Sequence, residues 1–216
     1  MEDGNGTPQI LLADDHRLVI EALRKLLEPH CSIVGLAPDG LSLLEIAPIL
    51  KPDVVIVDIA MPLLSGLEAG QQLKNIMPAV KLIFITMNED PGLAIEAMRG
   101  RASGYLLKSS AASELFQAIQ VALQGGTYVT PRIAKGMQDA FIRDPQAKSR
   151  DKRVTPRQRE VIQLLAEGKS MKEAAAILKL TPRTIAFHKY RAMEQLGFKN
   201  TASLIEFAIK DHILIA

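Results

Sequence analysis

Five short apolar runs alternate with stretches of helical spacing over the first 125 residues. The expected strands are 9–13, 32–37, 54–58, 81–86 and 104–108. A helix is expected after residue 15, and others over 41–49, 66–76, 91–98 and 113–124, where apolar residues recur every three or four positions. Strands and helices that alternate with short connections favour a parallel sheet covered on both faces by helices. We therefore predict an α/β doubly wound, five-stranded parallel sheet.

The third apolar run consists of four β-branched residues, Val54 to Val57, followed by Asp58. An entirely apolar run suits a strand that is buried on both faces. In open α/β sheets, binding and catalysis occur at the carboxyl ends of the strands, where Asp58 stands. A single aspartate after a strand is nevertheless more often a helix cap or turn former, so Asp58 alone carries little weight.

Polar residues stand at the carboxyl ends of several expected strands: Asp14, Asp15, Asp58, Thr86 and Lys108. In a parallel sheet these ends open on one edge. Crowded carboxylates raise one another's pKa values unless a cation lies among them, and Mg²⁺ is the hard, oxygen-binding cation expected there. Asp58 can then attack phosphorus while Lys108 and Thr86 hold the remaining oxygens. Taken singly, each residue has a simpler explanation. Thr86 could be an ordinary strand residue, and Lys108 could be a surface lysine.

Residues 126–152 differ in composition from the segments on either side. Thr130–Pro131 can open a helix that runs to Phe141, and residues 143–153 are rich in charge and poor in apolar groups. Such composition suits a solvated linker, with a DNA-contacting basic run as the alternative. We expect three parts, which are an α/β domain at 7–125, a partly helical linker at 126–152 and a second domain at 153–216.

The second domain is expected to be all-α and basic. Thr155–Gln158 and Ser170–Glu173 are capping boxes, Thr181–Pro182 opens a third helix and Thr201 a fourth. The middle two helices meet at a tight turn, as in a helix-turn-helix. Residues 153–216 hold eleven Lys/Arg against six Asp/Glu, whereas the rest of the chain has a net charge of −3. This asymmetry indicates that the basic part meets nucleic acid.

The third of these helices, residues 181–196, combines basic and aromatic side chains. Its expected buried stripe is Ile185, His188 or Lys189, Ala192 and Leu196. The candidate DNA contacts are Thr181, Arg183, Thr184, Phe187, His188, Lys189, Tyr190 and Arg191. Such a helix suits the major groove, and its N-terminus suits a phosphate. An amphipathic surface helix with incidental charge is the alternative.

Residues 9–125 resemble the receiver domain of two-component response regulators. The matching pieces are Asp14–Asp15, Asp58 with Met61–Pro62, Ser65–Gly66, Thr86 and Gly104–Lys108. The resemblance implies a flavodoxin-like fold in which Asp58 accepts a phosphoryl group from a histidine kinase. It also implies that Asp15, Asp58 and the Ala60 carbonyl bind Mg²⁺, with Asp14 acting through water.

The same resemblance implies that Thr86 and Tyr105 move on phosphorylation and reshape the neighbouring surface. On the sequence alone, without the resemblance, Tyr105 is better explained as a half-buried aromatic with a solvated hydroxyl. Met87 departs from the family, which usually has a small residue there, and we expect it to narrow access to the phosphorylated Asp58.

Residues 154–212 resemble the LuxR-type helix-turn-helix of the NarL/FixJ regulators. The matching residues are Val154–Glu160, Leu164–Gly168, Ala174, Ala175, Ile177, Leu178, Thr184, Ile185, His188 and Leu196–Gly197. In this family a lysine that approaches the bases usually occupies the position of Ala186. Phe187 and Tyr190 would lie at or near base-facing positions, where Phe187 can contact a thymine methyl group.

We therefore expect a transcription regulator switched by phosphorylation, with a sensor histidine kinase and double-stranded DNA as partners. It should form a homodimer when phosphorylated and catalyse no reaction beyond its own phosphorylation and dephosphorylation. The alternative is a phosphoryl sink or slow phosphatase whose basic domain binds a protein. A single cysteine, Cys31, with neither a signal peptide nor a run of roughly 20 apolar residues, suggests a cytoplasmic protein without membrane contact.

Overall fold

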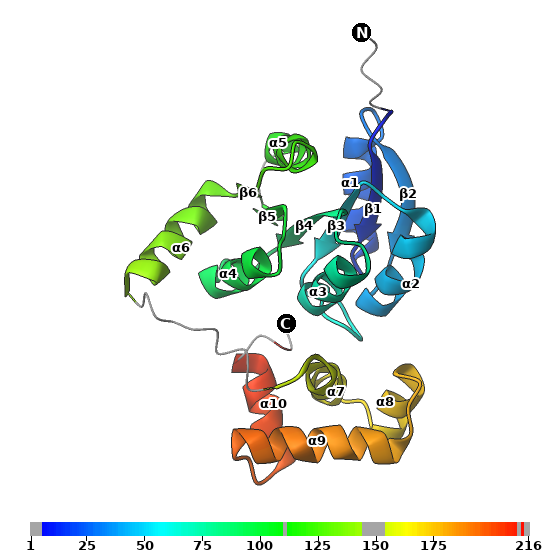
Figure 1. The fold of residues 1–216 in the computed structure, drawn as a ribbon, viewed down its shortest axis with the longest axis vertical. Helices are drawn as coiled ribbons and strands as arrows, with labels where there is room; N and C mark the ends of the chain where they lie inside the picture. Colours follow the sequence, from blue (N-terminus) through cyan, green and yellow to red (C-terminus); the bar gives the residue numbers. More distant parts are fainter. Residues whose placement is uncertain (1–5, 110–111, 144–153, 211–212, 214–216) are drawn as a thin grey trace. The chain divides into compact units, whose positions relative to one another are not determined.

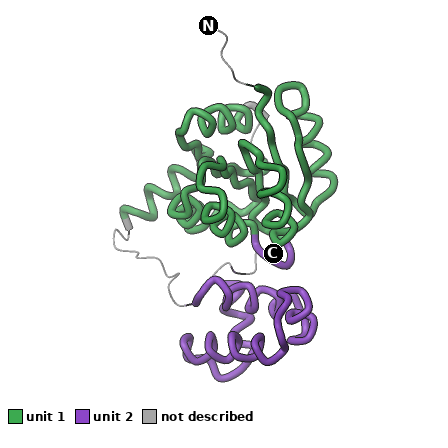
Figure 2. The backbone as a smooth tube through the Cα atoms, turned by 45° about the vertical axis from the view of Figure 1, so that its right-hand side comes forward, with its two compact units in different colours: residues 1–61, 66–145 green, residues 62–65, 146–216 purple. Residues whose placement is uncertain are grey.

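The computed structural model of this chain describes residues 6–109, 112–143, 154–210 and 213. The chain divides into two compact units, which Figure 2 shows in different colours. The first unit comprises residues 1–61 and 66–145, and the second comprises residues 62–65 and 146–216. The charged stretch expected to be a solvated linker falls largely on residues 144–153, which lie outside the described residues.

The first unit is built on a parallel sheet with the strand order β2-β1-β3-β4-β5-β6 (Figure 1). Its strands are β1 (Gln9–Ala13), β2 (Ser32–Ala37), β3 (Val54–Asp58), β4 (Lys81–Thr86), β5 (Gly104–Leu107) and β6 (Tyr128–Val129). All five pairings are parallel. The doubly wound parallel sheet is confirmed, but the predicted number of five strands is wrong because a sixth strand lies at the edge.

Helices cover both faces of this sheet (Figure 1). They are α1 (Arg17–Leu27), α2 (Gly40–Leu50), α3 (Gly66–Ile76), α4 (Pro91–Arg99) and α5 (Ala112–Leu123). Leu27 of α1 and Ala118 of α5 belong to one buried cluster with Ile56 of β3, so α1 and α5 share a face. The central strand β3 is buried along its whole length, as its apolar sequence predicts.

The sixth strand extends the sheet beyond β5. The N–H of Tyr128 donates to the Ser103 carbonyl at 3.1 Å, and the N–H of Thr130 donates to the Tyr105 carbonyl at 3.0 Å. A two-residue strand is too short to show any periodicity, which is why the sequence did not reveal it. It forms because β5 would otherwise leave an open edge of backbone groups.

Helix α6 (Pro131–Arg143) follows β6 and packs against α4. A Cβ atom at Gly136 would lie 2.7 Å from Cγ of Pro91, so glycine permits the two helices to approach closely. Arg132 at the start of α6 also pairs with Glu89 at 2.7 Å. The helix predicted from Thr130 to Phe141 is present, and it is part of the first unit.

The second unit contains α7 (Pro156–Ala166), α8 (Met171–Ile177), α9 (Pro182–Leu196) and α10 (Thr201–Lys210). Capping boxes open α7 at Thr155 and α8 at Ser170, as the sequence predicts. The turn from α8 to α9 is short and includes Lys179 at φ 54°. The prediction of an all-α helix-turn-helix fold is confirmed. Within the described ranges, none of the helices is long and apolar enough to cross a membrane.

Candidate functional site

The ends of β1 and β3 bring a group of acidic side chains together. One ligand atom from each of Asp14, Asp15, His16 and Asp58 lies within 4.8 Å of the others. The Asp14 and Asp58 side chains are almost completely buried, because Asp14 directly follows the buried residues of β1 and Asp58 is the last residue of the fully buried β3. The parallel sheet thus gathers the three carboxylates that the sequence predicted to converge.

Lys108 lies among these carboxylates, directly after β5. Its Nζ atom is 2.7 Å from Oδ2 of Asp14 and 2.8 Å from Oδ2 of Asp58. Burial opposes the charge of Lys108, but its hydrogen bonds to Asp14 and Asp58 raise the pKa of the ammonium group overall. Lys108 is therefore a charged partner of both acids and not a surface lysine.

The charges of the acidic group do not balance. Burial raises the pKa of Asp58, nearby Asp14 raises it further, and hydrogen bonds from Lys108 and the Ala60 N–H oppose the rise. Three carboxylates face one ammonium, which leaves two negative charges uncompensated when all are ionised. This set of oxygen donors fits a hard divalent cation such as Mg²⁺.

His16 is a member of the acidic group that sequence reasoning missed. Its Nδ1 atom lies 3.2 Å from Oδ1 of Asp14 and 3.0 Å from Oδ1 of Asp15, while its side chain is largely exposed. Its backbone N–H also donates to Asp14 at 2.9 Å. The only signal in the sequence was its position directly after the two aspartates.

Thr86 and Tyr105 occupy neighbouring strands beside this group. Thr86, at the end of β4, is buried, and its hydroxyl accepts a hydrogen bond from the Asn88 N–H at 3.0 Å. Tyr105 in β5 is completely buried, and its hydroxyl has no hydrogen-bond partner within the part of the chain that the structure describes. Burial, with Asp90 nearby, raises the pKa of Tyr105 well above its usual value. The alternative of a half-buried tyrosine with a solvated hydroxyl is wrong, because Tyr105 is 0% exposed.

Met87 follows Thr86 and is 72% exposed. It lines a groove of about 500 Å³ together with Leu18 of α1, Leu106 of β5 and Lys108. The side chain is therefore beside the lysine of the acidic group rather than packed in the core.

Helix α9 divides into a buried and an exposed side. Ile185, Ala192 and Met193 are buried, whereas Leu196 and His188 are only partly so. Met193 was not among the residues expected inside. It is buried because it belongs to a hydrophobic cluster of the second unit, in which it packs with Leu204 of α10 and other residues.

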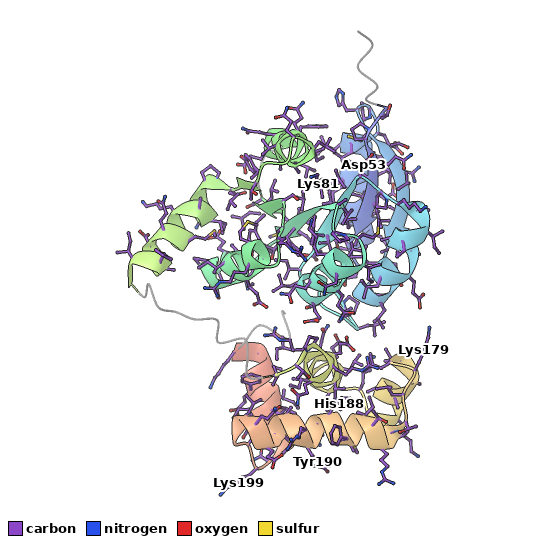
Figure 3. The ribbon with its side chains drawn as sticks, in the orientation of Figure 1. Asp53, Lys81, Lys179, His188, Tyr190 and Lys199 are labelled. Atoms are coloured by element: carbon purple, nitrogen blue, oxygen red, sulfur yellow. The ribbon has the colours of Figure 1, made fainter. Side chains whose placement is uncertain are left out.

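The candidate DNA contacts on α9 differ in exposure. Thr181, Arg183, Phe187, Tyr190 and Arg191 are exposed, whereas Thr184, His188 and Lys189 are partly buried (His188 and Tyr190 are labelled in Figure 3). The Thr181 hydroxyl accepts from the Thr184 N–H at 3.2 Å, so it caps the helix itself. The ring of Phe187 meets that of His188 edge-on, with centroids 5.5 Å apart.

Comparison with known proteins assigns both units. The response regulator receiver domain family matches residues 10–120, and the luxR family of bacterial regulatory proteins matches residues 152–208. The transcriptional regulatory protein MctR of Rhizobium johnstonii is 32% identical over 210 residues, which cover 96% of this chain and 95% of MctR. The oxygen regulatory protein NreC of Staphylococcus aureus is 30% identical over 214 residues, which cover 95% of this chain and 99% of NreC.

Solved structures give the same assignment. A structure of the RcsB response regulator of Salmonella typhimurium has a TM-score of 0.60 at 28% identity and covers 94% of this chain and 98% of that chain. An RcsB–DNA complex has a TM-score of 0.59 at 28% identity, with the same coverage. The chain therefore belongs to the two-component response regulators that control transcription through a receiver domain and a LuxR-type helix-turn-helix domain.

Proposed function

We propose that Asp58 is the phospho-acceptor of this response regulator and that a sensor histidine kinase is the donor. The observation that carries the proposal is the buried Asp58 carboxylate at the end of β3, with the Lys108 ammonium 2.8 Å away. We assign the receiver domain to residues 7–125 and the DNA-binding domain to 153–216. Within the segment assigned as the linker, 126–152, β6 and α6 pack on the receiver.

In the proposed transfer, a carboxylate oxygen of Asp58 attacks the phosphorus of a phosphohistidine. The O–P bond forms, the P–N bond breaks and its electron pair returns to the imidazole nitrogen. Lys108 exchanges its contact with Asp58 for one with a phosphoryl oxygen, and the Thr86 hydroxyl holds another. Hydrolysis of the resulting acyl phosphate resets Asp58, so the receiver catalyses its own phosphorylation and dephosphorylation.

Mg²⁺ is the proposed cofactor of the acidic group. Asp15, Asp58 and the Ala60 carbonyl would hold it directly, and Asp14 through water. When bound, the ion supplies the positive charge that neutralises the phosphoryl oxygens.

The proposed readout of phosphorylation passes through Thr86 and Tyr105. Thr86 turns toward the phosphoryl group and gives up the hydrogen bond from Asn88. Tyr105 moves with it. Its buried hydroxyl has no hydrogen-bond partner among the described residues, so its present position costs about 1–3 kcal/mol. Because β5 is hydrogen-bonded to β6, a change in β5 reaches the chain that leads to the second unit.

The proposed output is a homodimer that binds double-stranded DNA. Helix α9 would enter the major groove with the contacts Thr181, Arg183, Thr184, Phe187, His188, Lys189, Tyr190 and Arg191. A structure of two RcsB dimers bound to DNA, 27% identical to this chain, supports this assembly.

The test compares the wild type with Asp58→Asn, with and without acetyl phosphate. Asp53→Asn is the matched control, because Asp53 precedes β3 at the opposite end of the strand from Asp58 (Figure 3). Phosphate-affinity gels should show a shifted band for the wild type and Asp53→Asn and none for Asp58→Asn. The same two proteins should dimerise in sizing columns and bind duplex DNA more tightly.

Equal DNA binding under all conditions would overturn the switch while leaving DNA binding intact. Binding to random duplex DNA should fall steeply with salt, since phosphate contacts release counterions. Absence of duplex binding at low salt would favour the phosphoryl sink whose basic domain binds a protein.

A further inference from the structure

We propose that Phe187 and Tyr190 are specificity-determining residues, which select operator positions by contact with the 5-methyl groups of thymine. The inference rests on the proposed DNA binding by α9 and names what that helix recognises. It begins from two large aromatic side chains that are 61% and 58% exposed on one helix.

The two rings lie on the side of α9 that faces away from its core. With 3.6 residues per turn, Phe187, Tyr190 and Glu194 share one face, opposite Ile185 and Ala192. The latter two are completely buried. Phe187, Tyr190, Arg191 and Glu194 together line a hollow on this exposed face. The surface that α9 offers to a groove is therefore aromatic at its centre.

Two of the basic side chains on α9 that could read a guanine, Arg191 and Lys189, are engaged within the helix itself. A guanine is normally recognised by a free arginine or lysine that donates to O6 and N7. The Arg191 guanidinium is bound by Glu194 at 2.7 Å within the same helix. The Lys189 ammonium lies 5.3 Å from the centre of the Tyr190 ring. Position 186 carries an alanine, which cannot donate a hydrogen bond.

The major groove offers one apolar group to such a surface. The thymine 5-methyl group is the only methyl that the four unmodified bases place there. Covering a methyl group with an aromatic ring removes apolar area from water and strengthens binding about fourfold for each methyl buried. The attraction of Lys189 to the Tyr190 ring places a positive charge beside the rings, where it can also reach a phosphate.

The experiment measures binding of the full chain, treated with acetyl phosphate, to two defined duplexes. One is an alternating dA-dT duplex, and the other is an alternating dA-dU duplex, which lacks only the 5-methyl groups. The wild type should bind the dA-dT duplex at least fourfold more tightly. Phe187→Ala and Tyr190→Ala should each reduce this ratio, and Phe187→Leu should keep part of it because leucine is still apolar.

Two control variants separate this effect from a general one. Arg183→Ala should weaken binding to both duplexes and leave the ratio of the two affinities unchanged, because a contact with a phosphate does not depend on which base is present. Ile209→Ala removes an exposed apolar side chain from α10 and should leave both affinities unchanged. Helical content from circular dichroism shows that each variant is folded.

Equal binding of both duplexes by the wild type, or a ratio that survives in Phe187→Ala and Tyr190→Ala, would overturn the recognition of thymine. Either result leaves the proposed function intact as long as binding to both duplexes is salt-dependent. Absence of binding to both duplexes would overturn the proposed function itself, together with this inference.

Discussion

The Nζ atom of Lys108 lies 2.8 Å from Oδ2 of Asp58, although the two residues are fifty positions apart in the chain. The same atom lies 2.7 Å from Asp14, so one ammonium is shared by two buried carboxylates. A buried charge is stable only when it is paired, and one cation does not pair three acids. Repulsion within the acidic group therefore destabilises the folded protein, and a bound divalent cation would relieve this repulsion.

Magnesium should stabilise the folded protein. At about 100 times its dissociation constant, the ion should raise the free energy of unfolding by about 2.7 kcal/mol. Asp15→Asn removes one proposed ligand and should lose most of this gain, whereas Asp53→Asn should keep it. Thermal unfolding with Mg²⁺ and with a chelator measures the difference. Equal stabilisation of Asp15→Asn and the wild type would contradict the ligand assignment.

Without metal, stability should depend on pH through Asp58. Burial raises the pKa of Asp58 above its ordinary value of 3.8, so the folded state holds this proton to a higher pH than the unfolded chain does. The contribution of Asp58 to stability therefore falls as the pH rises from 3.8 through the raised folded value. The loss is about 1.4 kcal/mol for each pH unit that separates the two pKa values.

The check compares the wild type with Asp58→Asn in a chelator across this pH interval. The variant does not titrate at residue 58, so it should be more stable than the wild type at neutral pH. The difference in the free energy of unfolding between the variant and the wild type should become smaller as the pH is lowered toward 3.8. A difference in the free energy of unfolding that grows on acidification would mean that the fold stabilises Asp58 as a carboxylate, and it would refute the prediction.

Much of the receiver fold follows from the sequence because its strands are short and mostly apolar runs. Val54–Asp58 is buried on both faces, and a strand of that kind must lie at the centre of a covered sheet. Once the sheet is parallel, the strand ends meet, so the approach of Asp58 to Lys108 also follows. The resemblance to a known family added roles for these residues, which composition and periodicity do not provide.

The features that the sequence did not reveal depend on contacts between elements. Strand β6 has two residues and exists through its pairing with β5. Met193 is buried because it packs in one cluster with Ile162 of α7 and Leu204 of α10, and the periodicity of one helix does not tell where its neighbours lie. The complete burial of Tyr105 likewise depends on how the elements next to β5 pack against it, which the residue type does not tell.

The packing of α6 against α4 should depend on Gly136. A Cβ atom there would lie 2.7 Å from Cγ of Pro91, whose ring is rigid. Gly136→Leu should therefore displace α6 and speed hydrogen exchange of its amides, even though leucine favours helix more than glycine does. Lys135→Leu, at an exposed neighbouring position, is the control and should leave exchange unchanged. Unchanged exchange in Gly136→Leu would show that the helices accommodate the side chain.

The hydroxyl group of Tyr105 should destabilise the folded state. It is buried and has no hydrogen-bond partner among the described residues, so removing it in Tyr105→Phe should raise the free energy of unfolding by about 1–3 kcal/mol. Tyr128→Phe is the matched control, because the Tyr128 hydroxyl is bonded to Glu114. Its removal should be neutral or should lower stability by about 1 kcal/mol. Denaturant unfolding of the unphosphorylated protein measures both variants. A Tyr105→Phe variant less stable than the wild type would show that this hydroxyl is satisfied in solution.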